Sequence, residues 1–175
     1  MIGVDGALYA AMEFDGEAIS RLSMDSRFAI ANMAIEAGGK NGIFEADEKT
    51  LEFIKGRGKK PHTIYKSDKN ARYKEVYEID VTGLGLKVAC PSLPSNVKDA
   101  NELGNIAIDQ AVIGSCTNGR MEDLEVAAQI LKGKRVAKDV RCIIIPATPT
   151  IYRDCLLYTS PSPRDRTRSR MPSSA

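Results

Sequence analysis

A strand, a sharp turn and a helix follow one another over residues 108–131, and this stretch constrains the fold more than any other. Residues 111–113, Ala-Val-Ile, form a short apolar, β-branched run of the kind found in buried strands. Gly114 allows a sharp turn, because a residue without a Cβ tolerates conformations closed to other residues. From Met121 the apolar residues recur at helical spacing, which predicts a helix over residues 120–132.

A second strand completes the pattern. Residues 140–146 are strongly apolar and predict a strand after the helix. Strand, helix and strand in this order make a βαβ unit, which implies an α/β fold with a parallel sheet and a site at the carboxyl ends of its strands. Thr117 and Asn118 precede the helix and are residue types that cap helix N-termini. A further helix is expected from residue 147, with Pro149 in its first turn.

Cys116 lies at the turn between the first strand and the helix. Free backbone N–H groups at such a turn favour the thiolate, the form of cysteine that binds metal or attacks a substrate. Packing alone is the alternative, since a cysteine without a disulfide is among the most frequently buried residue types. On these residues alone both interpretations of Cys116 stay open.

A helix is predicted over residues 24–37, with a serine as cap before it and two glycines after it. Residues 28–35 are apolar apart from Asn32, which predicts a buried helix. Asn32 and Glu36 are four residues apart and therefore project from the same face. Polar groups on a buried helix need hydrogen-bond partners or a function, so the two form either a structural pair or a functional one.

The remaining predicted elements are short. Strands are predicted at residues 7–9, 12–14, 41–46 and 76–81, helices at 16–22 and 47–55, and an extended, proline-punctuated crossing at 88–97. His62, the one histidine, is expected at the surface, because no second histidine accompanies it to build a zinc site or a catalytic pair. Cys90 and Cys142 carry no ligand spacing and are expected to be structural.

The composition excludes several classes of protein. Four unevenly spaced cysteines are too few for a disulfide framework, so a reduced, cytoplasmic compartment is expected. No apolar run approaches the roughly 20 residues of a membrane helix, and no membrane partner is expected. The net charge is +2, but the four arginines and one aspartate of residues 155–175 contribute +3, which leaves −1 for the first 154. Without a basic stripe, no nucleic-acid partner is expected.

Residues 155–175 depart from the pattern of the preceding chain. Ser160-Pro161-Ser162-Pro163 interrupts the helix expected from residue 147, and the segment contains no core-forming run, so it is predicted to be disordered. The segment also resembles the translation of sequencing-adapter DNA, and it is expected to be a non-native tail outside the fold. A short arginine-rich binding peptide is the functional alternative.

Three segments carry a resemblance to a known family, the crossing at residues 88–97 and two more specific motifs. Residues 114–124, Gly-Ser-Cys-Thr-Asn-Gly-Arg-Met-Glu-Asp-Leu, resemble the first cluster-ligand motif of the aconitase superfamily. Residues 32–38, Asn-Met-Ala-Ile-Glu-Ala-Gly, are similar to a second segment of that superfamily. The closest likeness is to the branch of 3-isopropylmalate dehydratase large subunits and homoaconitases, because aconitase itself diverges where this chain has Gly119-Arg120. The resemblance extends from the first residues to about Asp154.

The resemblance implies an aconitase-like fold and an iron–sulfur cofactor. Residues 1–98 are expected to be part of one α/β domain and residues 99–154 the start of the next. Cys116 is implied to be one of three thiolates that hold a [4Fe–4S] cluster. The other two cysteines of the family's cluster would lie beyond residue 154, so the chain is expected to be an internal fragment.

The resemblance also assigns roles to the other candidate site residues. Asn32 is implied to lie against the cluster, and Glu36 to reach the hydroxyl that leaves the substrate. Ser115, Thr117 and Asn118 are implied to shape the turn that presents the cluster ligand.

The implied activity is that of a hydro-lyase. It would isomerise a small 2-hydroxy acid, 2-isopropylmalate, to 3-isopropylmalate by loss and return of water, with a separate small subunit as partner. Homoaconitase or another aconitase-type hydratase is the alternative within the superfamily. An alternative of another class is a non-catalytic α/β module in which Cys116 is structural.

Overall fold

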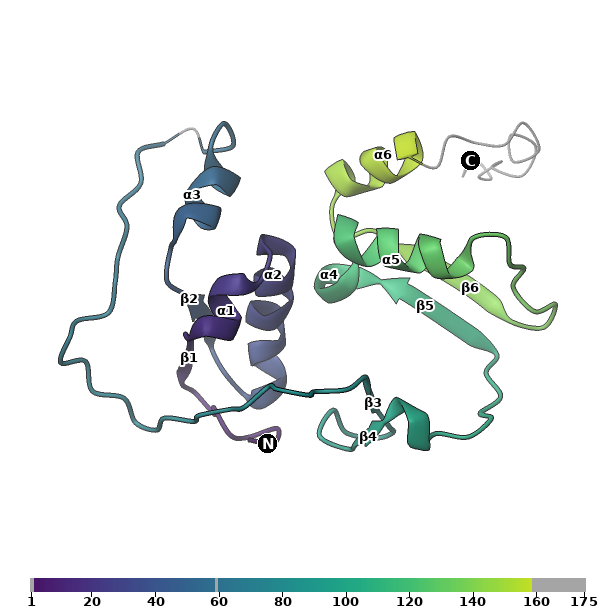
Figure 1. Cartoon of the computed structure of the whole chain (residues 1–175), viewed down its shortest axis with the longest axis horizontal. Coiled ribbons are helices and arrows are strands. Elements are labelled where there is room, and N and C mark those ends of the chain that lie inside the picture. Colours follow the sequence, from purple (N-terminus) through teal and green to yellow (C-terminus); the bar gives the residue numbers. More distant parts are fainter. Residues whose placement is uncertain (1, 59, 159–175) are drawn as a thin grey trace, which may run out of the picture. The chain divides into compact units, whose positions relative to one another are not determined.

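The computed structural model describes residues 2–58 and 60–158, which divide into two compact units (Figure 1). The first unit ends at Ala107 and the second begins at Ile108. Each unit contains a pair of parallel strands with helical segments between them in the sequence. The α/β class with parallel strands is therefore confirmed.

The first unit is built on a parallel pair, β1 (Ala11–Phe14) and β2 (Asn41–Phe44). The chain between the two strands forms α1 (Glu17–Arg21), α2 (Met24–Met33) and the 3-10 turn η1 (Ala34–Ala37). After β2 comes α3 (Glu48–Ile54). The strands end on Phe14 and Phe44, which are register partners and stack with their ring centroids 5.1 Å apart. This contact closes the carboxyl end of the pair.

The helical segment begins at Met24 and ends at Ala37 as its sequence predicts, but its last four residues form the 3-10 turn η1 instead of continuing α2. The Ser23 hydroxyl oxygen accepts the Ser26 N–H at 3.1 Å and caps the helix. Gly38 closes η1 in the left-handed conformation with φ of 76°, which glycine adopts without steric cost. Gly42 of β2 lies so near the helix that an added Cβ would be 2.8 Å from Ala31 Cα. A glycine is therefore required where the strand backbone meets α2.

Three expectations for the first unit are wrong in detail. Residues 7–9 form a turn instead of a strand, because the N–H groups of Ala7 and Tyr9 bond the carbonyls that end η1. Residues 76–81 are not a strand either: their side chains alternate, but no described segment pairs with their backbone. The predicted crossing at residues 88–97 is instead a small hairpin of β3 (Lys87–Ala89) and β4 (Val97–Asp99). It leads into the 3-10 turn η2 (Ala100–Glu102).

The second unit contains the βαβ arrangement predicted around Cys116. Strand β5 (Gln110–Gly114) runs parallel to β6 (Arg141–Ile145), with Gln110 opposite Arg141 and Gly114 opposite Ile145. The segment between them forms the short helix α4 (Ser115–Asn118) and the longer α5 (Met121–Leu131). Leu124 is the residue that α5 buries. Helix α6 (Pro149–Tyr158) follows β6, and Pro149 occupies its first turn as predicted.

The start of α5 differs from the prediction. Arg120 is the N-cap, and its N–H donates to Asp123 Oδ2 at 3.0 Å. Thr117 and Asn118, predicted as caps of this helix, belong instead to the separate turn of α4. The reason is geometric: the helical path is broken at Gly119, so a new helix, α5, starts at Met121 with Arg120 as its N-cap.

Helix α6 continues past Asp154, the residue after which the sequence predicts a tail. It ends at Tyr158, and the Cys155 sulfur lies 3.9 Å from Met121 Sδ of α5. The expectation that the chain leaves the fold at residue 155 is therefore wrong for Cys155, because α6 continues through it and its sulfur contacts α5. The rest of the predicted tail, residues 159–175, lies outside the described residues.

Candidate functional site

The turn that carries Cys116 is fixed by the close approach of β6 to Gly114. Gly114 has φ of 116°, and a Cβ built on it would lie 2.1 Å from the Ile145 carbonyl oxygen of β6. Ser115 then takes a left-handed conformation, with φ of 82°, which is uncommon for a residue other than glycine. Strained backbone of this kind persists only where its surroundings impose it, and it is concentrated at functional sites.

The result is an exposed thiol in α4, the turn that follows β5 at its carboxyl end. Figure 1 shows α4 directly after β5. The Cys116 sulfur lies 3.8 Å from the Thr117 hydroxyl oxygen. In open parallel sheets, ligands bind at this end of the strands. Ser115, Thr117 and Asn118 complete the turn of α4. Their participation in a site stays a prediction.

A shallow depression opens beside this turn, between β5 and the start of α5. Cys116 does not line it. The depression is lined by Val112, Ile113, Gly114, Asn118, Glu122, Asp123 and Val126. The Asn118 side-chain amide donates to Asp123 Oδ1 at 3.4 Å, so Asn118 links the Cys116 turn to the first turn of α5.

Asn32 and Glu36 lie on the exposed side of α2 and η1. The covered side of this segment includes Ala34, which is 3% exposed. The helix tightens to a 3-10 turn at Ala34, so Glu36 belongs to η1, whereas Asn32 belongs to α2. Both side chains are exposed, as a site requires.

The expectation that α2 is buried on all sides is wrong. Met33 is 44% exposed and Ile35 is 66% exposed, whereas the most covered side chain of the helix is Arg27, at 3% exposed. Apolar composition predicts burial only where other chain segments cover each face, and within the first unit no described segment covers this one. Sequence reasoning missed Arg27, although an arginine directly before the apolar residues of α2 was the available signal.

The two parts of the candidate site belong to different units. Asn32 and Glu36 are in the first unit, and Cys116 is in the second. Their meeting at a common cleft stays a prediction.

Cys116 fits one ligand position of a metal cluster, because it is an exposed thiol at a backbone turn with a polar neighbour. Within residues 2–58 and 60–158, no three His, Cys, Asp or Glu side chains gather as a metal site. The described residues therefore contain no complete set of cluster ligands, and ligation by Cys116 stays a prediction. His62 is exposed, as predicted.

Comparison with known proteins decides the family. A sequence model of the aconitase family (aconitate hydratase) matches residues 1–105 and 96–156. The chain belongs to the aconitase family. This confirms the resemblance carried by residues 32–38 and 114–124.

Curated relatives in the family are large subunits of 3-isopropylmalate dehydratase. The chain is 60% identical to that of Acetivibrio thermocellus over 156 residues, which is 89% of this chain and 37% of the relative. It is 60% identical to that of Moorella thermoacetica and 57% identical to that of Helicobacter hepaticus, each over 155 residues and with the same coverage. The chain thus spans 37% of the length of these relatives. Among the described residues, no helix is long and apolar enough to cross a membrane.

Proposed function

We propose that this chain is a segment of a hydro-lyase that interconverts 2-isopropylmalate and 3-isopropylmalate by dehydration and rehydration at a [4Fe–4S] cluster. Two findings support the proposal: membership of the aconitase family, and 60% identity to 3-isopropylmalate dehydratase large subunits. The observation that carries it is the exposed Cys116 at a sterically fixed turn at the carboxyl end of β5. A packing cysteine would be covered at that position.

In this proposal Cys116 is one thiolate ligand of the cluster. The bound cluster supplies an open iron that acts as a Lewis acid toward the hydroxyl and carboxylate of the substrate. Gly114 and Ser115 hold the thiol outward, and Asn118 ties the turn to α5 through Asp123. These contacts keep the ligand in place without help from the substrate.

Asn32 and Glu36 act on the side of the substrate. The Glu36 carboxyl group gives a proton to the hydroxyl oxygen as it leaves and takes a proton back when water returns. The Asn32 amide offers hydrogen-bond donors to the surroundings of the cluster. The exposure of both side chains on one side of α2 and η1 supports these roles.

The partner in this proposal is a small subunit. The name of the relatives, large subunit, supports such a partner. The small subunit would bring the base that removes the carbon-bound proton, and it would also carry most of the residues that sort 2-hydroxy acids. The cytoplasm is the proposed location, as for an enzyme with a cluster held by thiolates.

A hybrid subunit tests the proposal. In the Acetivibrio thermocellus large subunit, the 156 matching residues are replaced by those of this chain, and the product is assembled with its small subunit, iron and sulfide under argon. The expected result is a hybrid that holds a cluster and turns over 2-isopropylmalate. A folded hybrid without a cluster would favour the non-catalytic module.

A further inference from the structure

Arg27 of α2 is the one buried charged side chain among the described residues, at 3% exposed. Its Nη2 lies 2.6 Å from Asp47 Oδ2 of the segment before α3. The hydrogen bond from Arg27 holds the pKa of the Asp47 carboxyl well below its usual range, and the same bond raises the pKa of Arg27. The pair is therefore fully ionised at neutral pH.

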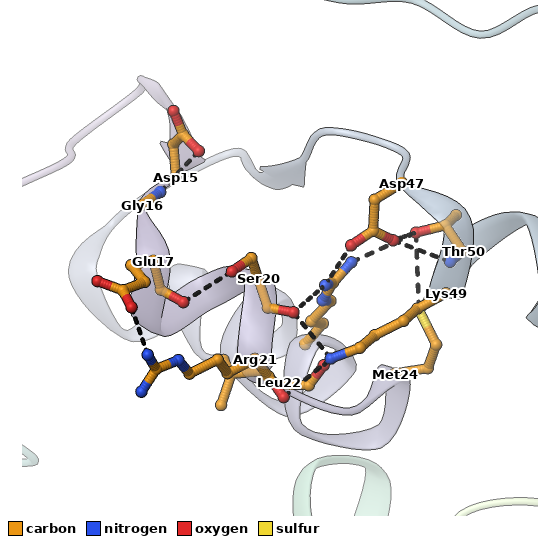
Figure 2. Close-up of polar contacts among 11 residues, drawn as sticks. Asp15, Gly16, Glu17, Ser20, Arg21, Leu22, Met24, Asp47, Lys49 and Thr50 are labelled. Carbon is orange, nitrogen blue, oxygen red and sulfur yellow. Dashed lines mark hydrogen bonds and ion pairs between the residues drawn. The ribbon is translucent and has the colours of Figure 1, made fainter.

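The pair is the centre of a network that joins three helices. The same Arg27 nitrogen is 3.4 Å from the Ser20 carbonyl oxygen of α1, and Asp47 caps α3 by accepting the Thr50 N–H at 3.0 Å. Figure 2 shows Lys49 reaching back to the end of α1. Its Nζ donates to the carbonyl oxygens of Ser20, Arg21 and Leu22 at 2.8, 2.9 and 3.1 Å. We call Arg27, Asp47 and Lys49 the helix brace.

The brace is a costly way to stabilise a fold. Removing a guanidinium from water carries a desolvation penalty that its ion pair roughly offsets, so an apolar residue of similar size is often as stable. Arg27 Nε adds to this cost, because it is buried without a hydrogen-bond partner among the described residues. Unlike an apolar contact, the ion pair is directional, because a guanidinium holds a carboxylate in a fixed geometry.

The fixed geometry of this ion pair holds the face of α2 that lies opposite Asn32 and Glu36. Arg27, Ala31 and Ala34 follow at intervals of four and three residues and form the rear of the helix. This rear is held twice, by the brace near the start of α2 and by the close approach of Gly42 to Ala31 near its end. Asn32 and Glu36 lie on the other, exposed side. Two fixed points on the rear set the rotation of the helix, and with it the direction of both side chains.

We propose that Arg27 is a positioning residue: through its ion pair with Asp47 it fixes the rotation of α2 and so aims Asn32 and Glu36 at the substrate. This inference rests on the proposed function. A displacement of about 1 Å in a catalytic group costs on the order of 10²-fold in rate. Loosening the brace therefore lowers kcat while substrate binding and the cluster stay in place.

The test uses the hybrid enzyme with its small subunit and cluster. Arg27→Met keeps the bulk of the side chain and removes its charge, and Asp47→Asn keeps an N-cap residue type for α3 but removes the ion pair. Arg21→Met is the matched control, because Arg21 is an exposed arginine of the neighbouring α1 whose side chain pairs with Glu17 of its own helix. Iron content, kcat, KM, the urea midpoint and amide exchange of residues 28–36 are measured for each.

The expected result is a roughly 10- to 100-fold lower kcat for Arg27→Met and Asp47→Asn. KM and iron content stay unchanged, and exchange at residues 28–36 is faster. Arg27→Lys recovers part of the loss, because it keeps the charge without the planar fork, and Arg21→Met matches the parent.

Two results would overturn the inference: unchanged kcat in Arg27→Met, or a loss of activity that only follows the unfolded fraction. If Arg27→Met does not fold, Asp47→Asn decides by the same criteria. An inactive parent hybrid refutes the proposed function and not the positioning. In that case amide hydrogen exchange tests the positioning role of Arg27. Equal protection of residues 28–36 in the parent and in Arg27→Met would refute that role.

Discussion

Replacing Gly114 by alanine tests whether the Cys116 turn is sterically fixed. The added Cβ would lie 2.1 Å from the Ile145 carbonyl oxygen and 2.8 Å from its carbonyl carbon. Both atoms belong to the backbone of β6, so no side-chain rotation relieves the overlap. Strand β6 must move away from β5, or the turn must change its path.

Two terms contribute to the cost. Alanine at φ of 116° adopts a backbone conformation that costs about 1–3 kcal/mol. Overpacking against well-placed neighbours adds about 1–3 kcal/mol. The expected loss in the free energy of unfolding is therefore about 2–6 kcal/mol. Gly133→Ala separates the terms, because Gly133 has φ of 73° and an added Cβ would have no neighbouring atom within 4 Å. It carries conformational strain without the overlap.

Urea unfolding of the chain, followed by circular dichroism, measures both variants against the parent. We expect Gly133→Ala to lose about 1 kcal/mol and Gly114→Ala to lose clearly more. A smaller iron content in a hybrid that carries Gly114→Ala would follow from a displaced Cys116. Equal losses in the two variants would show that contact with β6 does not fix the turn.

Three further predictions concern the ionised and ligating groups. The folded-state pKa of Asp47 is lowered, so its pairing with Arg27 stabilises the chain at pH values above the ordinary carboxyl pKa of about 3.9, and this stabilisation is lost as pH falls through the lower folded value. In Asp47→Asn the urea midpoint should therefore depend less on pH between about pH 5 and pH 2 than in the parent. The same pH dependence in parent and variant would contradict this. The 175-residue chain alone, treated with iron and sulfide under argon, should hold no stoichiometric cluster and show no isomerase turnover, since its described residues contain no group of three metal-ligating side chains; a full complement of iron with turnover would refute the ligand count. In the hybrid, Glu36→Gln should keep the cluster and lower turnover by about 10²–10⁴-fold, and parent-like turnover would remove the role given to Glu36.

Local patterns in the sequence predicted both strands and the main helix around Cys116, but not the separate turn α4. Residues 110–145 combine a β-branched run, a glycine turn, a helix of regular period and a second apolar run, and each signal agrees with the others. The strand predicted at residues 76–81 had only alternation to support it. Alternation of polar and apolar residues predicts a segment with one polar and one apolar face. A β-strand also needs the backbone of a second strand to pair with, and local sequence does not show whether that strand is present.

Long-range partners explain what the sequence did not reveal about the site. Asn32 and Glu36 could be placed on one face from their spacing, but Arg27 could not be matched with Asp47, 20 residues later, by any period or motif. The strained conformation of Ser115 was equally hidden, because it follows from the approach of β6 to Gly114. Contacts between segments distant in sequence decide both features.

The central claim is that Cys116 ligates the cluster of a dehydratase, and the iron content of a cysteine variant tests it most directly. In the hybrid large subunit, Cys116→Ser is compared with Cys142→Ser, which alters a half-buried cysteine of β6 outside the proposed site. We predict that Cys142→Ser keeps the parent's iron, cluster absorption and 2-isopropylmalate turnover, whereas a folded Cys116→Ser loses all three. A Cys116→Ser enzyme with the parent's iron content and turnover would contradict the claim.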